Sequence, residues 1–147
     1  MNQTSHADAI ALSDRLHSAA IHLLRRVRQQ DVAAGVGPAR LSALSVLVFG
    51  GPKTLGELAA AEQVKPPTMS RIVAALKKSH LVTVAGDPED GRRTRIRATA
   101  NGTRLLQKAR QLRVAALAEQ VRHLPAEEFP KLAEGVEILG KLLVKWG

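Results

Sequence analysis

The chain of 147 residues is long enough for one domain with a hydrophobic core, and it carries a net charge of +9 from 22 basic and 13 acidic residues. It contains no cysteine, which excludes disulfides and thiolate metal sites. The N-terminal residues show no secretion signal, and the longest uncharged run, residues 41–52, is too short to span a bilayer. These features predict a cytoplasmic protein.

The positive charge is concentrated in one third of the chain. Residues 65–113 contain twelve basic and three acidic residues, whereas the remaining residues contain ten of each. A confined positive field favours a polyanionic partner, because every neutralised phosphate releases condensed counterions. Nucleic acid and an anionic membrane surface both fit this pattern. The alternative is a chance excess of lysine and arginine on solvated helix faces.

The first third of the chain reads as two helices. Apolar residues at three- and four-residue spacing predict a long helix over residues 6–31, capped by Thr4 or Ser5. Glycines and a proline within residues 35–38 end this helix and begin the next one, which stops at the break in residues 50–52.

A helix-turn-helix is predicted next. Thr54 and Glu57 form a capping box that opens a short helix, and Pro66 begins a second helix over about residues 66–79. The apolar face of the second helix is Met69, Ile72, Val73 and Leu76, and its opposite face is Thr68, Arg71, Ala75 and Lys78. A small and basic face on the second helix is typical of a recognition helix in a major groove. An ordinary surface helix is the alternative.

Residues 81–98 predict a β-hairpin whose second strand is rich in arginine. The alternating residues are Val82 and Val84 on one strand and Thr94, Ile96 and Ala98 on the other. Arg93, Arg95 and Arg97 then share one face, and Arg92 lies at or near the tip. A hairpin after a recognition helix is a wing, and an arginine at its tip suits a narrow minor groove. A charged edge strand that prevents aggregation is the alternative.

Two helices are predicted to complete the chain. Thr99 caps a long helix, and the last helix carries apolar residues in steps of three and four. These residues are Phe129, Leu132, Val136, Leu139 and Leu143. Such a seam on a terminal helix favours packing between subunits. A core within one chain is the alternative.

Taken in order, these elements resemble the MarR-type (multiple antibiotic resistance regulator) winged-helix family over almost the whole chain. The most specific feature is the wing signature, whose members fall in register without a gap: Asp87, Asp90, Arg92, Thr99 and Gly102. The resemblance implies a mainly α fold with a small β-hairpin wing, in which a winged helix-turn-helix is flanked by long dimerisation helices.

The resemblance also implies how the chain is organised. Residues 1–37 are expected to form an N-terminal dimerisation helix, residues 38–100 the DNA-binding region, and residues 101–147 the C-terminal dimerisation helices of one structural unit. Within the DNA-binding region, the recognition helix covers about residues 66–79 and the wing about residues 81–98. The implied protein is a homodimer that represses or activates transcription at a palindromic operator in double-stranded DNA.

Individual side chains take roles by the same resemblance. Thr68, Ser70 and Arg71 fall at the positions that face the major groove. Arg92 takes the position that enters the minor groove, and Asp90 that of the carboxylate that steadies the wing. With their neighbours, the predicted DNA-binding residues are Lys65, Thr68, Ser70, Arg71, Lys78, Arg92, Arg93 and Arg95, and the predicted wing-stabilising residues are Asp87 and Asp90.

The sequence departs from the family pattern at the end of the recognition helix. His80 stands where the family usually has glycine. Because histidine reaches left-handed backbone conformations more readily than most residues, we expect it to be tolerated there with some strain.

No constellation for catalysis, metal binding or a cofactor is present in the sequence. The five histidines include no pair at i, i+4 with an acidic partner on the same helix face, and no phosphate-binding loop or catalytic carboxylate pair occurs. The resemblance raises a small aromatic anion as effector, for which the sequence assigns no pocket. We therefore expect a dimeric, sequence-specific transcriptional regulator, a repressor released by a small ligand, with no membrane partner. A non-specific architectural DNA-binding protein is the alternative. An enzyme or a winged-helix protein-interaction module is disfavoured, because the catalytic constellation is missing and one segment is strongly basic.

Overall fold

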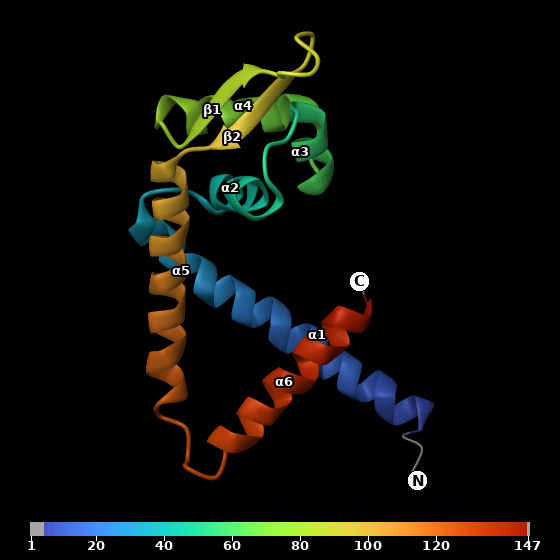
Figure 1. Cartoon of the computed structure of the whole chain (residues 1–147). Coiled ribbons are helices and arrows are strands. Elements are labelled where there is room, and N and C mark those ends of the chain that lie inside the picture. Colours follow the sequence, from blue (N-terminus) through green and yellow to red (C-terminus); the bar gives the residue numbers. More distant parts are fainter. Residues whose placement is uncertain (1–4, 147) are drawn as a thin grey trace. The chain divides into compact units, whose positions relative to one another are not determined.

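The computed structural model describes residues 5–146 and is mainly helical, with one β-hairpin (Figure 1). Its elements are α1 (His6–Arg28), the 3₁₀ helix η1 (Gln29–Ala34), α2 (Pro38–Gly50), α3 (Leu55–Ala61), α4 (Pro66–Lys78), β1 (Val82–Gly86), β2 (Thr94–Ala98), α5 (Ala100–Val121) and α6 (Phe129–Trp146). This is the predicted mainly α fold with a small hairpin.

The chain divides into two compact units, Met1–Arg113 and Val114–Gly147. The first contains all elements from α1 to β2 and the larger part of α5, and the second contains the end of α5 and all of α6. The boundary therefore falls inside a helix. The predicted functional regions 1–37, 38–100 and 101–147 stay a prediction.

The first helix begins where the sequence indicates. The Ser5 hydroxyl accepts a hydrogen bond of 3.1 Å from the backbone N–H of Asp8, which satisfies a free donor of the first turn. Thr4, the alternative cap, lies outside the described residues. The regular α-helix ends at Arg28, and a 3₁₀ helix continues to Ala34 before Gly35 turns the chain with a φ of 80°. The long first helix is confirmed, although its last turn is tighter than expected.

The helix-turn-helix is formed by α3 and α4. Thr54 and Glu57 make the predicted capping box, in which the Thr54 hydroxyl accepts from the Glu57 N–H at 3.2 Å and the Glu57 carboxylate accepts from the Thr54 N–H at 2.8 Å. Gln63, with a φ of 54°, makes the turn between the helices. Met69 and Leu76 on α4 are fully buried, so this helix is anchored on its apolar side.

The hairpin pairs β1 with β2 in antiparallel register, with Val84 opposite Ile96. Sequence analysis missed a short third segment at the other edge of β2. There the Lys53 N–H donates to the Ile96 carbonyl at 3.1 Å, and the Ile96 N–H donates to the Lys53 carbonyl at 2.7 Å. β2 is therefore held on both sides, and buried Ile96 joins it to the core.

The turn after the recognition helix is fastened to the start of α5. His80 has a φ of 57°, as its expected left-handed role requires, and its carbonyl accepts a hydrogen bond of 2.8 Å from the Thr99 hydroxyl. The same hydroxyl accepts from the Gly102 N–H at 3.0 Å, which confirms Thr99 as the cap of α5. Gly102 leaves no room for a side chain, because a Cβ there would lie 2.3 Å from the Leu81 carbonyl oxygen.

The core of the first unit joins α2, α3 and α4 to the hairpin and α5. Its fully buried large side chains include Leu41, Leu44, Leu58, Met69, Leu76 and Ile96. In residues 5–146, no single helix is apolar and long enough to cross a bilayer, and α1–η1 with α2 meets that test only as a pair bent by 90°. Leu41, Ala43, Leu44 and Leu47 of α2 belong to this core, whereas Phe49 near its end is exposed.

Candidate nucleic-acid interface

α4 presents a polar and basic face to solvent. Because Met69, Val73 and Leu76 point into the core, helical spacing leaves Thr68 and Arg71 on the outer side. All predicted DNA-binding residues on and just before this helix are exposed: Lys65, Thr68, Ser70, Arg71 and Lys78. The helix can therefore enter a groove without first unfolding part of the core.

A groove beside α4 adds a basic residue that sequence analysis missed. It has a volume of about 370 Å³ and runs from Arg71, Ile72 and Ala75 to the first residues of α2, where Arg40 lines it. The two arginines are far apart in the sequence, and only the packing of α2 against α4 brings them to one groove. Periodicity within one helix carries no signal for such a pair.

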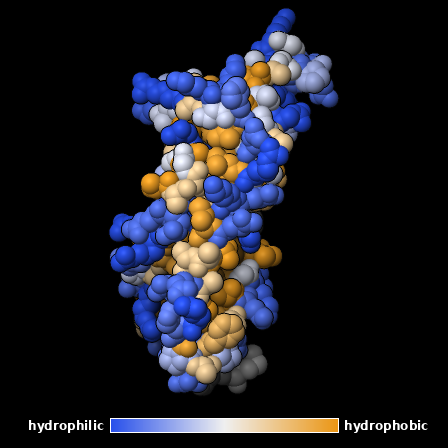
Figure 2. All heavy atoms as spheres, turned by 90° about the vertical axis from the view of Figure 1, so that its left-hand side faces the viewer, coloured by the Kyte–Doolittle hydropathy of each residue, from blue (hydrophilic) through white to orange (hydrophobic). Residues whose placement is uncertain are grey.

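The wing loop projects from the sheet as a free hairpin tip (Figure 1). Hydrophilic side chains predominate at the top of the view in Figure 2, where this loop lies. The carboxylate of Asp90 accepts from the Arg92 N–H at 3.1 Å, and the Asp90 carbonyl accepts from the Arg93 N–H at 2.9 Å. The Arg92 guanidinium is exposed and forms no ion pair with the residues that the structure describes. It is free to meet a ligand.

Asp87 and Arg95 form the shorter of the two ion pairs found in the wing among the described residues. The Arg95 Nε donates to the Asp87 carboxylate at 2.7 Å, and the other oxygen of that carboxylate accepts from the Glu89 N–H at 3.0 Å. Asp87 is buried, whereas the Asp90 side chain is about half exposed and lies 3.7 Å from the Arg93 Nε. Both predicted aspartates thus hold the wing, Asp87 at its base and Asp90 at its tip.

Hydrogen bonds and charges in the wing and at the start of α3 shift the pKa values of three side chains. The pKa of Asp87 lies below its usual value, because the Glu89 N–H and then the Arg95 guanidinium stabilise the carboxylate. The pKa of Arg95 is raised, chiefly by its hydrogen bond to Asp87. The pKa of Glu57 is lowered, chiefly by the Thr54 N–H, and the positive charge of Arg95 contributes. Arg95 therefore acts on carboxylates of both the wing and α3.

The arrangement of α3, α4 and an arginine-tipped hairpin defines a winged helix-turn-helix protein. Within the described residues, no group of three histidine, aspartate or glutamate side chains could hold a metal ion. The features that the geometry offers are those of a surface that binds a polyanion.

Comparison with known proteins identifies the family. The sequence model of the MarR family matches residues 34–93, the part that contains α2, the helix-turn-helix and most of the wing. A curated HTH-type transcriptional regulator of Mycobacterium bovis, described as uncharacterized, is 34% identical over 133 residues, which cover 90% of this chain and 92% of the relative. The chain belongs to the MarR family of transcriptional regulators.

Solved structures show the same fold. A transcriptional regulator from Thermotoga maritima matches with a TM-score of 0.79 at 22% identity, over 92% of this chain and 95% of that one. A mutant of S. aureus MepR, bound to an oligodeoxyribonucleotide, matches with a TM-score of 0.69 at 21% identity, over 89% of this chain and 97% of that one. The winged-helix fold expected from the sequence is therefore confirmed.

Proposed function

We propose that this regulator is a cytoplasmic homodimer that binds a palindromic operator in double-stranded DNA and represses transcription. The observation that carries the proposal is that one compact unit presents both the polar face of α4 and the unpaired Arg92 at the wing tip. A helix of this kind fits a major groove, and the arginine fits the adjacent minor groove. The S. aureus MepR mutant, which has a similar fold, is bound to an oligodeoxyribonucleotide, and this supports DNA as the partner.

Dimerisation is supported by the apolar surface of the long helices. Phe129, Val136 and Leu143 on α6 are 56%, 60% and 55% exposed in the single chain. Ile10 and Leu23 on α1 are similarly exposed, at 57% and 52%. Exposed apolar surface of this extent on each of these helices favours a protein interface, because leaving it in water is unfavourable.

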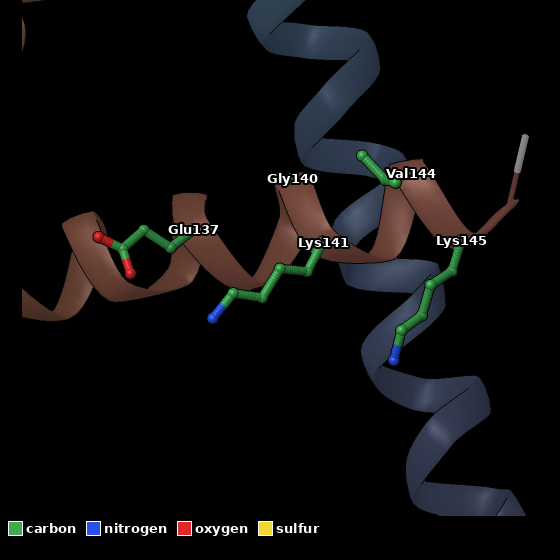
Figure 3. A pocket seen from close by; sticks show the side chains of 5 residues that line it. All are labelled: Glu137, Gly140, Lys141, Val144 and Lys145. Atoms are coloured by element: carbon green, nitrogen blue, oxygen red, sulfur yellow. The ribbon is translucent and has the colours of Figure 1, made fainter.

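α6 also carries a groove on the side where its charged residues lie. A groove of about 470 Å³ follows one side of the helix from Glu137 to Lys145, and Gly140 leaves a gap in its row of side chains (Figure 3). Lys141 and Lys145 extend to one side of this helix (Figure 3). Helical spacing places this groove on a different side of α6 from Leu132 and Leu143, so we assign the subunit contact to the apolar side and not to the groove.

A small cavity suggests where a ligand could relieve repression. It measures about 110 Å³ between α1, α2 and α5, and it is lined by Leu24 and Leu106 with the charged side chains of Arg28 and Arg113. Leu24 and Leu106 could pack against an aromatic ring, and Arg28 could meet its negative charge, whereas Arg113 is already paired with Asp31. We propose this cavity as the effector site. Binding there would favour one arrangement of α1 and α5 over another and change affinity for the operator.

Selection of genomic DNA fragments by the purified full chain tests the proposal. Enrichment of one two-fold symmetric sequence is expected, and its affinity should fall with salt at a slope of log K against log [salt] near −8, if a dimer neutralises about nine phosphates. Uniform recovery of fragments would favour the architectural alternative. Recovery of none would contradict DNA binding altogether.

A further inference from the structure

We propose that Arg95 is a positioning residue of the wing, which fixes the hairpin between Asp87 and the start of α3, and that it does not bind a DNA phosphate. This inference rests on the proposed DNA-binding function. It gives Arg95 a different role from Arg92 and Arg97, although all three lie on the same short segment.

The first observation is the contact at the base of the wing. Arg95 lies opposite Ala85 in the hairpin register, so Asp87 is its diagonal neighbour on the same face of the sheet. The 2.7 Å bond between them ends on Asp87, whose side chain is only 6% exposed. The Asp87 backbone N–H also donates to the Arg93 carbonyl at 2.7 Å, and this backbone hydrogen bond closes the base of the wing loop.

The second observation is on the other side of β2. Ile96 pairs with Lys53, which places Arg95 beside the capping box of Thr54 and Glu57. The lowered pKa of Glu57, which is due first to the Thr54 N–H and in smaller part to the charge of Arg95, agrees with this placement. One cation thus interacts with a carboxylate of the wing and with one of the helix-turn-helix.

A comparison with neighbouring arginines separates the two roles. The Arg95 side chain is 38% exposed and its Nε is already engaged, whereas the Arg93 side chain is 68% exposed. Arg97 follows on the same face of β2, is exposed, and forms no ion pair with the described residues. The Asp87 carboxylate already pairs with Arg95, so Arg95 has less to gain from a phosphate than Arg97 has.

The direction in which Asp87→Ala changes the affinity for DNA distinguishes a positioning role from a purely electrostatic one. Asp87→Ala removes a negative charge near DNA, so a purely electrostatic surface should bind the operator more tightly. If Arg95 and Asp87 position the wing, Asp87→Ala and Arg95→Gln should both weaken binding by about tenfold. The double variant should then be no weaker than either single variant, because the two side chains act as one unit.

The matched control is Arg97→Gln, which makes the same change of charge two residues away on the same face. Arg97→Gln should make the salt slope shallower by about one, whereas Arg95→Gln should leave the slope unchanged. Exchanging the partners, with Asp87→Arg and Arg95→Asp together, should restore most of the affinity at unchanged net charge. Tighter operator binding by Asp87→Ala would overturn the proposal. So would a salt slope for Arg95→Gln that becomes as shallow as the slope for Arg97→Gln.

A measurement without DNA makes the test independent of the proposed function. Hydrogen exchange of the free protein should show the Asp87 and Glu89 amides exchanging at least about tenfold faster in Arg95→Gln than in the wild type, since these amides close the base of the loop. Unchanged rates there would refute the positioning role. Accelerated rates in a chain that selects no DNA fragment would leave the positioning role in place and remove the DNA-binding function.

Discussion

Arg113 on α5 donates two hydrogen bonds of 2.6 Å to the carboxylate of Asp31 on η1, across 82 residues of sequence. Asp31 is fully buried, and the Arg113 side chain is one-third exposed at 32%. This bidentate pair ties the end of the first helical segment to α5 within the first unit.

Removing one partner of this pair should be costly. Arg113→Ala leaves the Asp31 carboxylate buried without its counter-charge, so we expect a loss of about 3 kcal/mol in the free energy of unfolding. Urea denaturation measures the loss. Arg110→Ala, on the same helix with an exposed side chain, is the control and should change stability by no more than about 0.5 kcal/mol. Equal effects of the two variants would show that the pair does not stabilise the fold.

Gly102 should tolerate no side chain. Its Cβ would lie 2.3 Å from the Leu81 carbonyl oxygen, which belongs to the backbone and can yield only if the turn shifts. We expect Gly102→Ala to cost about 2 kcal/mol of stability in thermal unfolding. Gly56→Ala in α3 meets no atom within 4 Å and should instead stabilise by about 0.5 to 1 kcal/mol.

The proposed dimer depends on the apolar side of α6. Changing Leu132 and Leu139 together to aspartate should give monomeric or unfolded protein, because charges would replace apolar side chains in the interface. Sedimentation equilibrium at micromolar concentration measures the mass. Lys131→Asp, a change to the same residue beside Leu132, should leave the dimer intact. A folded wild-type monomer would refute the proposal.

The stabilisation that the Asp87 carboxylate gives to the wing should be lost at acid pH. The pKa of Asp87 is lower in the folded chain than in the unfolded chain, so its stabilisation is fully present above about pH 4 and disappears as the pH falls through the folded value. Asp87→Asn should therefore lose less stability than the wild type between about pH 5 and pH 2. Melting temperatures across this range provide the measurement, and identical curves would contradict it.

Much of the architecture follows from local sequence signals. The capping box of Thr54 and Glu57, the cap at Thr99 and the left-handed His80 each depend on residues close in the chain or on the family pattern. The hairpin was predicted by alternation over residues 81–98, and its strands lie within that range. Local signals, together with the family pattern for His80, were enough to locate these features.

Contacts between distant segments were not predictable in the same way. The bridge between Lys53 and Ile96, the groove shared by Arg40 and Arg71, and the buried Asp31 arise only after the chain folds. The DNA-binding roles assigned to Arg93 and Arg95 stay predictions, and Arg95 shows why. Its sequence context marks it as one more wing arginine, whereas its position between two carboxylates depends on how the wing packs beside α3.

The central claim is that Arg92 at the wing tip reads a minor groove. Fluorescence anisotropy of Arg92→Ala and Arg97→Ala, on operator DNA with A·T-rich or G·C-substituted flanks, tests it most directly. Arg92→Ala should lose about 1 to 3 kcal/mol per half-site and its preference for A·T flanks, because groove width and potential are what this side chain senses. Arg97→Ala should keep that preference. Equal losses with the same flank preference in both variants would contradict the account.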